Sequence, residues 1–114
     1  MIQGFALAKE NNPKLKLEIM GPTEEDDEYF QECIDLVKYL EVKDITFTGR
    51  VNILEHLPKF DFMLLTSISE GQPFALLEAM ISRKPTIATD VGCCKELLQN
   101  ADDEFGKAGI IVPI

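Results

Sequence analysis

The chain has 114 residues, of which 46% are hydrophobic and 27% charged, so it is long enough for one globular domain with a modest core. Twenty acidic against eleven basic residues give a net charge of -9, which opposes binding to nucleic-acid phosphates and to anionic membranes. No apolar run approaches the roughly 18 residues of a membrane-spanning helix, and residues 1–10 lack the regions of a signal peptide. We therefore expect a cytoplasmic protein without membrane insertion.

The first half of the chain predicts two helices and two strands. A helix over residues 2–10 is followed by an alternating strand over 14–20. Thr23 is the expected cap of a helix over 24–40, and a short alternating strand follows over 44–49. The chain opens inside a helix, whereas doubly wound folds open with a strand, so the sequence looks like a piece of something larger.

The second half continues the alternation of helices and strands. The segment "FDFMLLTS" is almost continuously apolar, which predicts a strand buried on both faces and central in a parallel sheet. In chain order the predicted elements are a helix over 52–59, this strand over 60–67, a helix over 73–83, a strand over 84–90, a helix over 93–100, a loop over 102–109 and a strand over 110–113.

Strict alternation of this kind predicts one α/β domain over residues 1–114. We expect a Rossmann-like parallel sheet of about five strands with helices on both faces. The strands over 14–20 and 60–67 would flank the place of an opening strand, and leaving their backbone groups unpaired is costly. We expect them to pair directly, which gives the order 2-1-3-4-5, or a second copy of the chain to fill the gap in a homodimer.

Few residues are suited to metal binding or to histidine-based catalysis. The three cysteines, Cys33, Cys93 and Cys94, have no zinc-site spacing, and His56 is the single histidine. Reduced thiols are the simplest reading. The acidic run over 24–28 resembles a metal site, but acids are expected at a helix start, where the dipole is positive. We therefore predict no metal and no cofactor.

The stretch "SEGQPFALLEAM" follows the strand predicted to be most central. In open parallel sheets, ligands bind beyond the carboxyl ends of the strands. Gly71 permits close approach of backbone to a ligand, and Pro73 suits the first turn of a helix. The free amides of residues 74–76 would then form a phosphate cradle at the helix N-terminus.

Glu78 lies within this otherwise apolar helix. Phe74, Ala75 and Ile81 share its helical face, so we expect that face to be buried. A buried carboxylate needs hydrogen-bond donors. The two hydroxyls of a ribose would supply them, and so would the backbone of an adjacent loop; the residues alone leave both readings open.

The segments "SEGQPFALLEAM", "RKPTIATDVG" and "KELL" resemble the C-terminal domain of retaining glycosyltransferases of the GT-B fold, family-four type. The family signature of two glutamates separated by seven residues corresponds to Glu70 and Glu78. The resemblance extends to "LKLEIMGP", "ITFTGRV" and "AGIIVP", so it covers essentially the whole chain. The segments "EDDEYFQEC" and "DVGCCKELL" are most similar to the branch that builds the Pel exopolysaccharide.

This resemblance implies a nucleotide-sugar donor, with UDP-glucose as the suggested one, and no required metal. Glu70 would be the catalytic residue that faces the donor sugar. Gly71 and Gln72 would line the sugar pocket, and the amides near Phe74 and Ala75 would hold the diphosphate. Glu78 would bind the ribose hydroxyls, and Gly49, Arg50 and Val51 would flank the nucleobase. The expected donor-binding residues also include Pro73 and Leu76.

The sequence also departs from the resembled family. A basic pair that neutralises the diphosphate would lie upstream of this chain, as would the N-terminal domain that binds the acceptor. We therefore expect the chain alone to be inactive in sugar transfer and to be part of a full-length hexosyltransferase. Gly92, Cys93 and Cys94 stand where a Gly-Gly pair is usual.

Two alternatives from other classes remain open. A flavodoxin-like signalling module, such as a phospho-receiver, needs an acidic pair after its first strand, an aspartate ending the third and a lysine ending the fifth. The acids over 24–28 imitate the first requirement, but Ser67 and Pro113 stand near the other two places. A structural fragment without a site is the second alternative.

Overall fold

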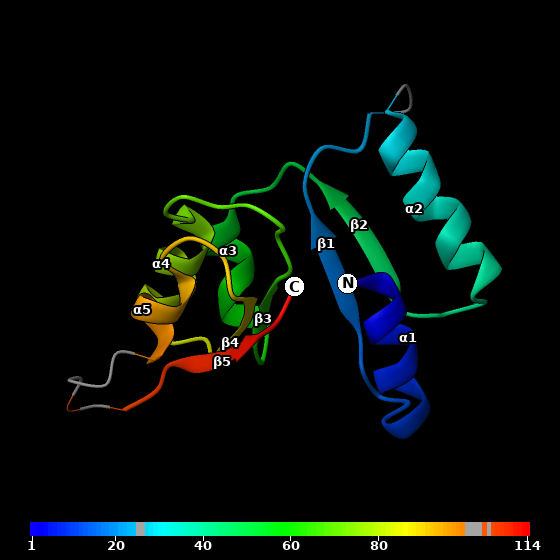
Figure 1. The fold of residues 1–114 in the computed structure, drawn as a ribbon. Coiled ribbons are helices and arrows are strands. Elements are labelled where there is room, and N and C mark those ends of the chain that lie inside the picture. Colours follow the sequence, from blue (N-terminus) through cyan, green and yellow to red (C-terminus); the bar gives the residue numbers. More distant parts are fainter. Residues whose placement is uncertain (25–26, 100–103, 105) are drawn as a thin grey trace. The chain divides into compact units, whose positions relative to one another are not determined.

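The computed structural model describes residues 1–24, 27–99, 104 and 106–114. The chain divides into two compact units, Met1–Val51 and Asn52–Ile114. Each unit is an α/β arrangement whose strands are parallel (Figure 1). The expected alternation of helices and strands is confirmed. None of the described helices combines the length and apolar character needed to cross a membrane.

The first unit consists of two helices and two strands: α1 (Ile2–Asn11), β1 (Leu17–Met20), α2 (Glu28–Tyr39) and β2 (Ile45–Gly49). β1 and β2 pair in parallel, with Leu17 opposite Ile45 and a register shift just before Met20. Leu17 is buried together with Ile2 and Phe5 of α1. The rings of Phe30 and Phe47 meet edge to face at 5.3 Å, which packs α2 on β2.

The start of α2 differs from the prediction. The cap is Asp27, not Thr23, and its carboxylate accepts hydrogen bonds from the amides of Tyr29 and Phe30. Aspartate is at least as good an N-cap as threonine, so residue preference alone does not decide between the two positions. Of the acidic run over 24–28, residues 25–26 lie outside the described part. Asp27 and Glu28 stand at a helix start, as the dipole argument expects.

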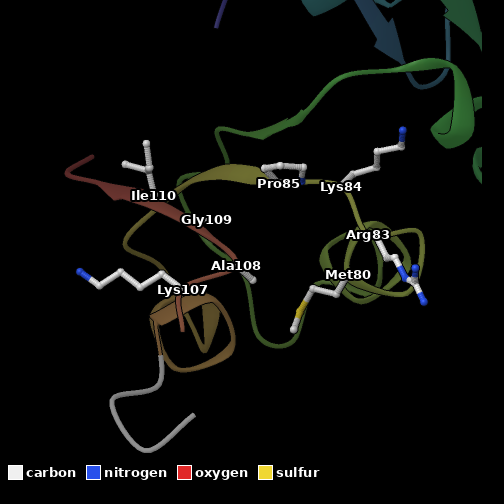
Figure 2. A pocket seen from close by; sticks show the side chains of 8 residues that line it. All are labelled: Met80, Arg83, Lys84, Pro85, Lys107, Ala108, Gly109 and Ile110. Atoms are coloured by element: carbon white, nitrogen blue, oxygen red, sulfur yellow. The ribbon is translucent and has the colours of Figure 1, made fainter. Parts of the chain in front are cut away.

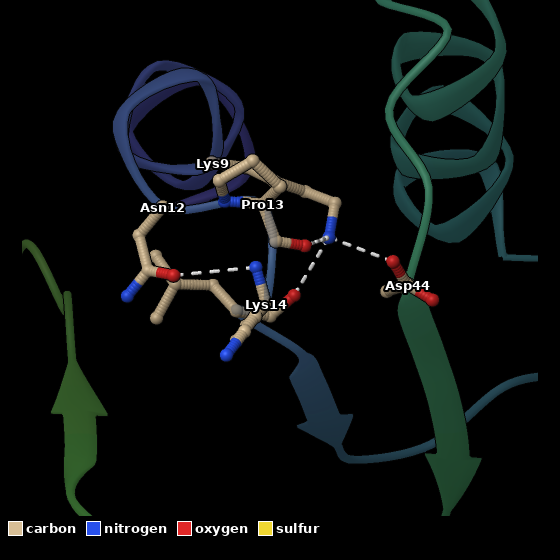
Figure 3. A network of polar contacts seen from close by, with 6 residues as sticks. Lys9, Asn12, Pro13, Lys14 and Asp44 are labelled. Carbon is tan, nitrogen blue, oxygen red and sulfur yellow. Dashed lines mark hydrogen bonds and ion pairs between the residues drawn. The ribbon is translucent and has the colours of Figure 1, made fainter.

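One lysine joins three segments of the first unit (Figure 3). The Lys9 ammonium donates to the backbone oxygens of Pro13 at 2.9 Å and Leu15 at 2.7 Å, and to Asp44 Oδ2 at 2.7 Å. Its side chain is only 15% exposed. Lys9 therefore links the last turn of α1 to the segments that enter β1 and β2.

The second unit holds the other elements: α3 (Ile53–His56), the 3-10 helix η1 (Leu57–Lys59), β3 (Met63–Leu65), α4 (Phe74–Ile81), β4 (Thr86–Thr89), α5 (Cys94–Gln99) and β5 (Gly109–Val112). The strands form one parallel sheet in the order β3-β4-β5. The single helix predicted over 52–59 is divided in two because Pro58 interrupts it and the last turn tightens.

The core of this unit lies where α4 and α5 pack on β4. Its buried side chains are Leu76, Ala88, Val91, Cys94 and Leu98. The expectation that β3 is buried on both faces is wrong here, because all three of its residues are half-buried. β4 is the more deeply buried strand, with both Thr86 and Thr89 inside.

The neighbour relations within each sheet, 2-1 and 3-4-5, agree with the predicted order. The remaining relation, between β1 and β3, connects the two units and stays a prediction. The homodimer that would take its place stays a prediction as well.

Candidate functional site

A loop over residues 66–73 leads from the carboxyl end of β3 into α4 and carries Glu70. Ser67 Oγ donates a hydrogen bond of 2.6 Å to Glu70 Oε1. Both side chains are half-buried. Among the described residues Glu70 Oε1 has this one donor and Oε2 has none. One oxygen of the carboxylate is therefore anchored, while the other is available to a ligand.

The loop after β4 packs directly against the Glu70 loop. The Cys93 amide donates to the Gly71 carbonyl at 3.3 Å. Gly92 has φ +51°, and a Cβ built on it would lie 2.3 Å from Glu70 O and 2.4 Å from Gly71 O. Only glycine fits so close an approach in a left-handed conformation. Backbone contacts therefore fix the loop that carries Glu70.

Cys94 lies beneath this contact and belongs to the core. Burial raises the pKa of the Cys94 thiol above its ordinary value, and the nearby Cys93 and Glu70 raise that pKa further. Cys33, Cys93 and Cys94 are all free thiols in the structure. A protonated, buried Cys94 contributes packing rather than reactivity.

The first turn of α4 offers fewer free amides than expected. Pro73 is the N-cap and provides no side-chain cap. The amide of Leu76 donates to the Pro73 carbonyl at 3.1 Å. The prediction that the Leu76 amide is free to bind a phosphate is therefore wrong. The amides of Phe74 and Ala75 have no hydrogen-bond partner among the described residues. These two can serve an anion at the positive end of the helix.

Glu78 lies one turn further along α4, on a face that is not buried as predicted. Phe74 is 77% exposed and Ile81 is 80% exposed, while Glu78 is half-buried. α4 turns Leu76 and Ala79 to the core instead. The described residues supply no hydrogen-bond donor to the Glu78 carboxylate, so the loop-backbone reading finds no support and the carboxylate is open to solvent or to a ligand.

The residues predicted beside the nucleobase lie in the first unit. Gly49 ends β2 with φ +72°, and its carbonyl accepts from the Gly21 amide at 3.1 Å. Arg50 is exposed and approaches Glu24 at 4.0 Å, and Val51 is half-buried. Gly49 to Val51 thus follow the carboxyl end of β2. Their meeting with Glu70 and Glu78 in one pocket stays a prediction.

A shallow hollow of about 470 Å³ lies at the opposite edge of the β3-β4-β5 sheet, at the amino ends of β4 and β5. Figure 2 shows the charged ends of Arg83, Lys84 and Lys107 pointing away from one another. Lys84 donates to the backbone carbonyls of Pro58 and Phe60. The lining residues are Met80, Arg83, Lys84, Pro85, Lys107, Ala108, Gly109 and Ile110, none of which belongs to the predicted site.

Sequence reasoning missed the side chains that support Glu70. Ser67 lies two residues beyond β3 and Thr89 is the last residue of the neighbouring strand β4, and Thr89 Oγ1 donates to the Ser67 carbonyl. The available signal was a hydroxyl residue at the carboxyl end of each strand, directly before a loop. The described residues contain no group of three or more His, Cys, Asp or Glu side chains that could hold a metal ion.

Parallel α/β units with a carboxylate loop beyond the strand ends are compatible with a GT-B-like glycosyltransferase fold. Consistently, a chain in the crystal structure of the GtfA/B complex superposes with a TM-score of 0.74 and 26% sequence identity, over 99% of this chain and 21% of that one. The family model described as glycosyl transferases group 1 matches residues 1–114, and the chain belongs to that family.

Two curated relatives are named as a synthase and as a glycosyltransferase. The N-acetyl-alpha-D-glucosaminyl L-malate synthase of Bacillus anthracis is 37% identical over 108 residues, which are 92% of this chain and 27% of the relative. The O-antigen biosynthesis glycosyltransferase WbnH of Escherichia coli is 34% identical over 76 residues, which are 60% of this chain and 22% of the relative. The chain thus spans about a quarter of the length of these relatives.

Proposed function

We propose that this chain binds the nucleotide-sugar donor of a retaining glycosyltransferase, and that the donor is a UDP-sugar such as UDP-glucose. The observation that carries the proposal is the Glu70 loop. A carboxylate stands at the carboxyl end of β3, one of its oxygens is anchored by Ser67, and the other has no protein partner among the described residues. Membership of the glycosyl transferases group 1 family supports this assignment.

Each part of the site has a distinct task in this proposal. Glu70 Oε2 accepts hydrogen bonds from hydroxyls of the donor sugar, and the backbone at Gly71 and Gln72 lines the same pocket. The amides of Phe74 and Ala75 face the diphosphate, where they stabilise the negative charge that grows on the leaving group. The positive end of α4 supplies this stabilisation without a metal ion.

Glu78 is the proposed ribose acceptor. Its carboxylate can take a hydrogen bond from each of two neighbouring hydroxyls, which suits the geometry of a ribose. Gly49, Arg50 and Val51 flank the nucleobase in the same proposal.

The transfer reaction is proposed for a longer protein of the family, because the matched residues make up only 27% and 22% of the two relatives. The acceptor is a growing polysaccharide or another glycoconjugate, with the Pel-type exopolysaccharide branch as the narrower assignment. The reaction would take place in the cytoplasm. Donor binding without transfer is the activity that we propose for the 114 residues by themselves.

The test is a titration of the isotope-labelled chain with UDP, followed by amide chemical shifts. We expect shifts at residues 71–75. Glu78→Gln should weaken UDP binding by about 1–3 kcal/mol because a charged acceptor becomes a neutral one. The fold should survive, since Glu78 makes no side-chain hydrogen bond with the described residues.

Glu10→Gln is the matched control, because Glu10 is an exposed carboxylate on α1. It should leave the affinity for UDP unchanged. Absence of UDP-dependent shifts in the folded wild-type chain would refute the proposal and favour a structural role. Equal affinities of the wild type and Glu78→Gln would remove Glu78 from the site.

A further inference from the structure

Two hydroxyl side chains lie near the carboxyl ends of β3 and β4, and the donor-binding proposal does not use them. Ser67 follows β3 by two residues, and Thr89 is the last residue of β4. Thr89 is 7% exposed, which is deep burial for a polar side chain. Its Oγ1 contacts the carbonyls of Ser67 and of Leu65, the latter at 3.4 Å.

The Ser67 hydroxyl has one proton, and it donates that proton to Glu70 Oε1 at 2.6 Å. A hydroxyl-to-carboxylate hydrogen bond of this length is charge-assisted and strong. It restricts the rotation of the Glu70 side chain and thereby sets the direction of Oε2. Without Ser67, several rotamers of a half-buried glutamate would be open.

Thr89 restrains Ser67, which in turn restrains the Glu70 side chain. By binding the Ser67 carbonyl, Thr89 holds the backbone at Ser67 against β4. On the far side of Glu70, the Cys93 amide and the close approach of Gly92 hold the backbone of Glu70 and Gly71. The carboxylate is therefore constrained through its side chain and from both sides of its backbone.

We propose that Ser67 and Thr89 are positioning residues that orient the Glu70 carboxylate toward the sugar of the donor. They give the site its preference for a nucleotide sugar over the bare nucleotide. This inference rests on the proposed function, because it assigns Glu70 to the sugar. Preorganisation of this kind raises affinity because fewer conformations are lost on binding.

The test compares the affinities of the 114-residue chain for UDP and for UDP-glucose. We expect Ser67→Ala to lower the affinity for UDP-glucose by about three- to tenfold while the affinity for UDP is unchanged. Thr89→Val, which keeps the shape and removes the hydroxyl, should act in the same direction. Ser67→Thr and Thr89→Ser, which retain the hydroxyl, should restore the wild-type ratio of affinities.

A second measurement needs no ligand. Three-bond couplings between Hα and Hβ of Glu70 should indicate one rotamer in the wild type and rotamer averaging in Ser67→Ala. Ser82→Ala, a serine at the end of α4 whose side chain makes no hydrogen bond with the described residues, is the control. It should change neither the couplings nor the ratio of affinities.

The outcomes separate this inference from the donor-binding proposal. If UDP-glucose binds the wild type and Ser67→Ala lowers both affinities equally, or lowers neither, Ser67 is structural and the inference is overturned. Unchanged Glu70 couplings in Ser67→Ala overturn it independently. If neither ligand binds the folded wild type, the proposed function fails first and the inference falls with it.

Discussion

Glycine at position 92 sets how closely the two loops of the candidate site can approach. Its φ of +51° and the hypothetical Cβ distances of 2.3 Å and 2.4 Å to the carbonyl oxygens of Glu70 and Gly71 leave no space for a side chain. The contact involves backbone atoms, which cannot move aside as a flexible side chain can. Gly71, at the other side of the contact, has no atom within 4 Å of its own hypothetical Cβ.

Gly92→Ala should therefore lower the free energy of unfolding by about 1–3 kcal/mol, because a left-handed alanine and a backbone overlap are combined. Gly71→Ala, with open space around it, should lower it far less. Urea denaturation of both variants gives the comparison. Equal stabilities for Gly92→Ala and Gly71→Ala would show that the loop after β4 rearranges freely.

At this scale, the sequence draws attention to residues whose chemistry is unusual for their place. Glu70 and Gly71 stand out because an acid and a glycine follow a strand at the sheet edge where open parallel sheets generally bind ligands, and their place in a donor site stays a prediction. Ser67 and Thr89 do not stand out, because hydroxyl residues are common at strand ends. Their role depends on which two strands are neighbours, and that relation is visible only in the folded sheet.

At the scale of single elements, capping and core contact decide where helices and strands begin and end. α2 begins at Glu28 because Asp27 caps it, although Thr23 also has a suitable side chain. β3 covers three residues of the eight predicted, because only Met63 to Leu65 have β4 alongside. Apolar composition therefore predicts the position of a strand better than its length.

The hydrogen bonds of Lys9 to Pro13, Leu15 and Asp44 connect α1 to the segments that enter β1 and β2. The bond to Asp44 makes the stability of the first unit depend on pH. The hydrogen bond and the charge of Lys9 hold the pKa of the Asp44 carboxyl below its ordinary value. Because the folded pKa is lower than the unfolded one, the interaction stabilises the fold fully above the unfolded pKa of about 3.9. The stabilisation is lost as the pH falls through the lower, folded pKa.

Asp44→Asn should therefore be less stable than the wild type at pH 7, and the difference should disappear in strong acid. Urea midpoints measured between pH 7 and pH 2 test this dependence. Asp35→Asn is the control, since Asp35 forms an exposed pair with Lys38 that should contribute at most about 0.5 kcal/mol at pH 7. A constant difference between Asp44→Asn and the wild type at every pH would exclude the ionic contribution.

At the scale of the whole molecule, the prediction to test is the pairing of β1 with β3. Both strands have one neighbour each in the described sheets, β2 and β4. Unpaired backbone groups along a strand favour further pairing. We predict a five-stranded sheet in the order 2-1-3-4-5, or a homodimer in which a second copy occupies the gap.

Nuclear Overhauser effects between backbone protons of β1 and β3 would identify the five-stranded sheet. Sedimentation equilibrium would identify the homodimer. A monomer that shows no such backbone contacts would contradict both arrangements.

The class of fold is predictable from the sequence because helical and extended patterns alternate without exception along the chain. The family resemblance then predicts the GT-B character, which the structural superposition and the family model confirm. The relation between the two units is not predictable in the same way. In the predicted strand order it would depend on pairing between strands that are more than forty residues apart, and local patterns along the chain do not encode such pairing.

The hydrogen bonds of Thr89 also set an order of events during synthesis. Thr89 contacts Leu65 and Ser67, which lie 24 and 22 residues earlier in the chain. While the ribosome has released only the chain up to Arg83, the Glu70 loop and Ser67 exist, but Thr89, Gly92 and Cys93 do not. Its native shape must wait until β4 and the segment through Cys93 have emerged and docked on β3. The position of Glu70 therefore depends on residues that are synthesised after it. A chain that stalls before Thr89 would contain the Glu70 loop sequence, but the loop would lack the contacts that give it its native shape.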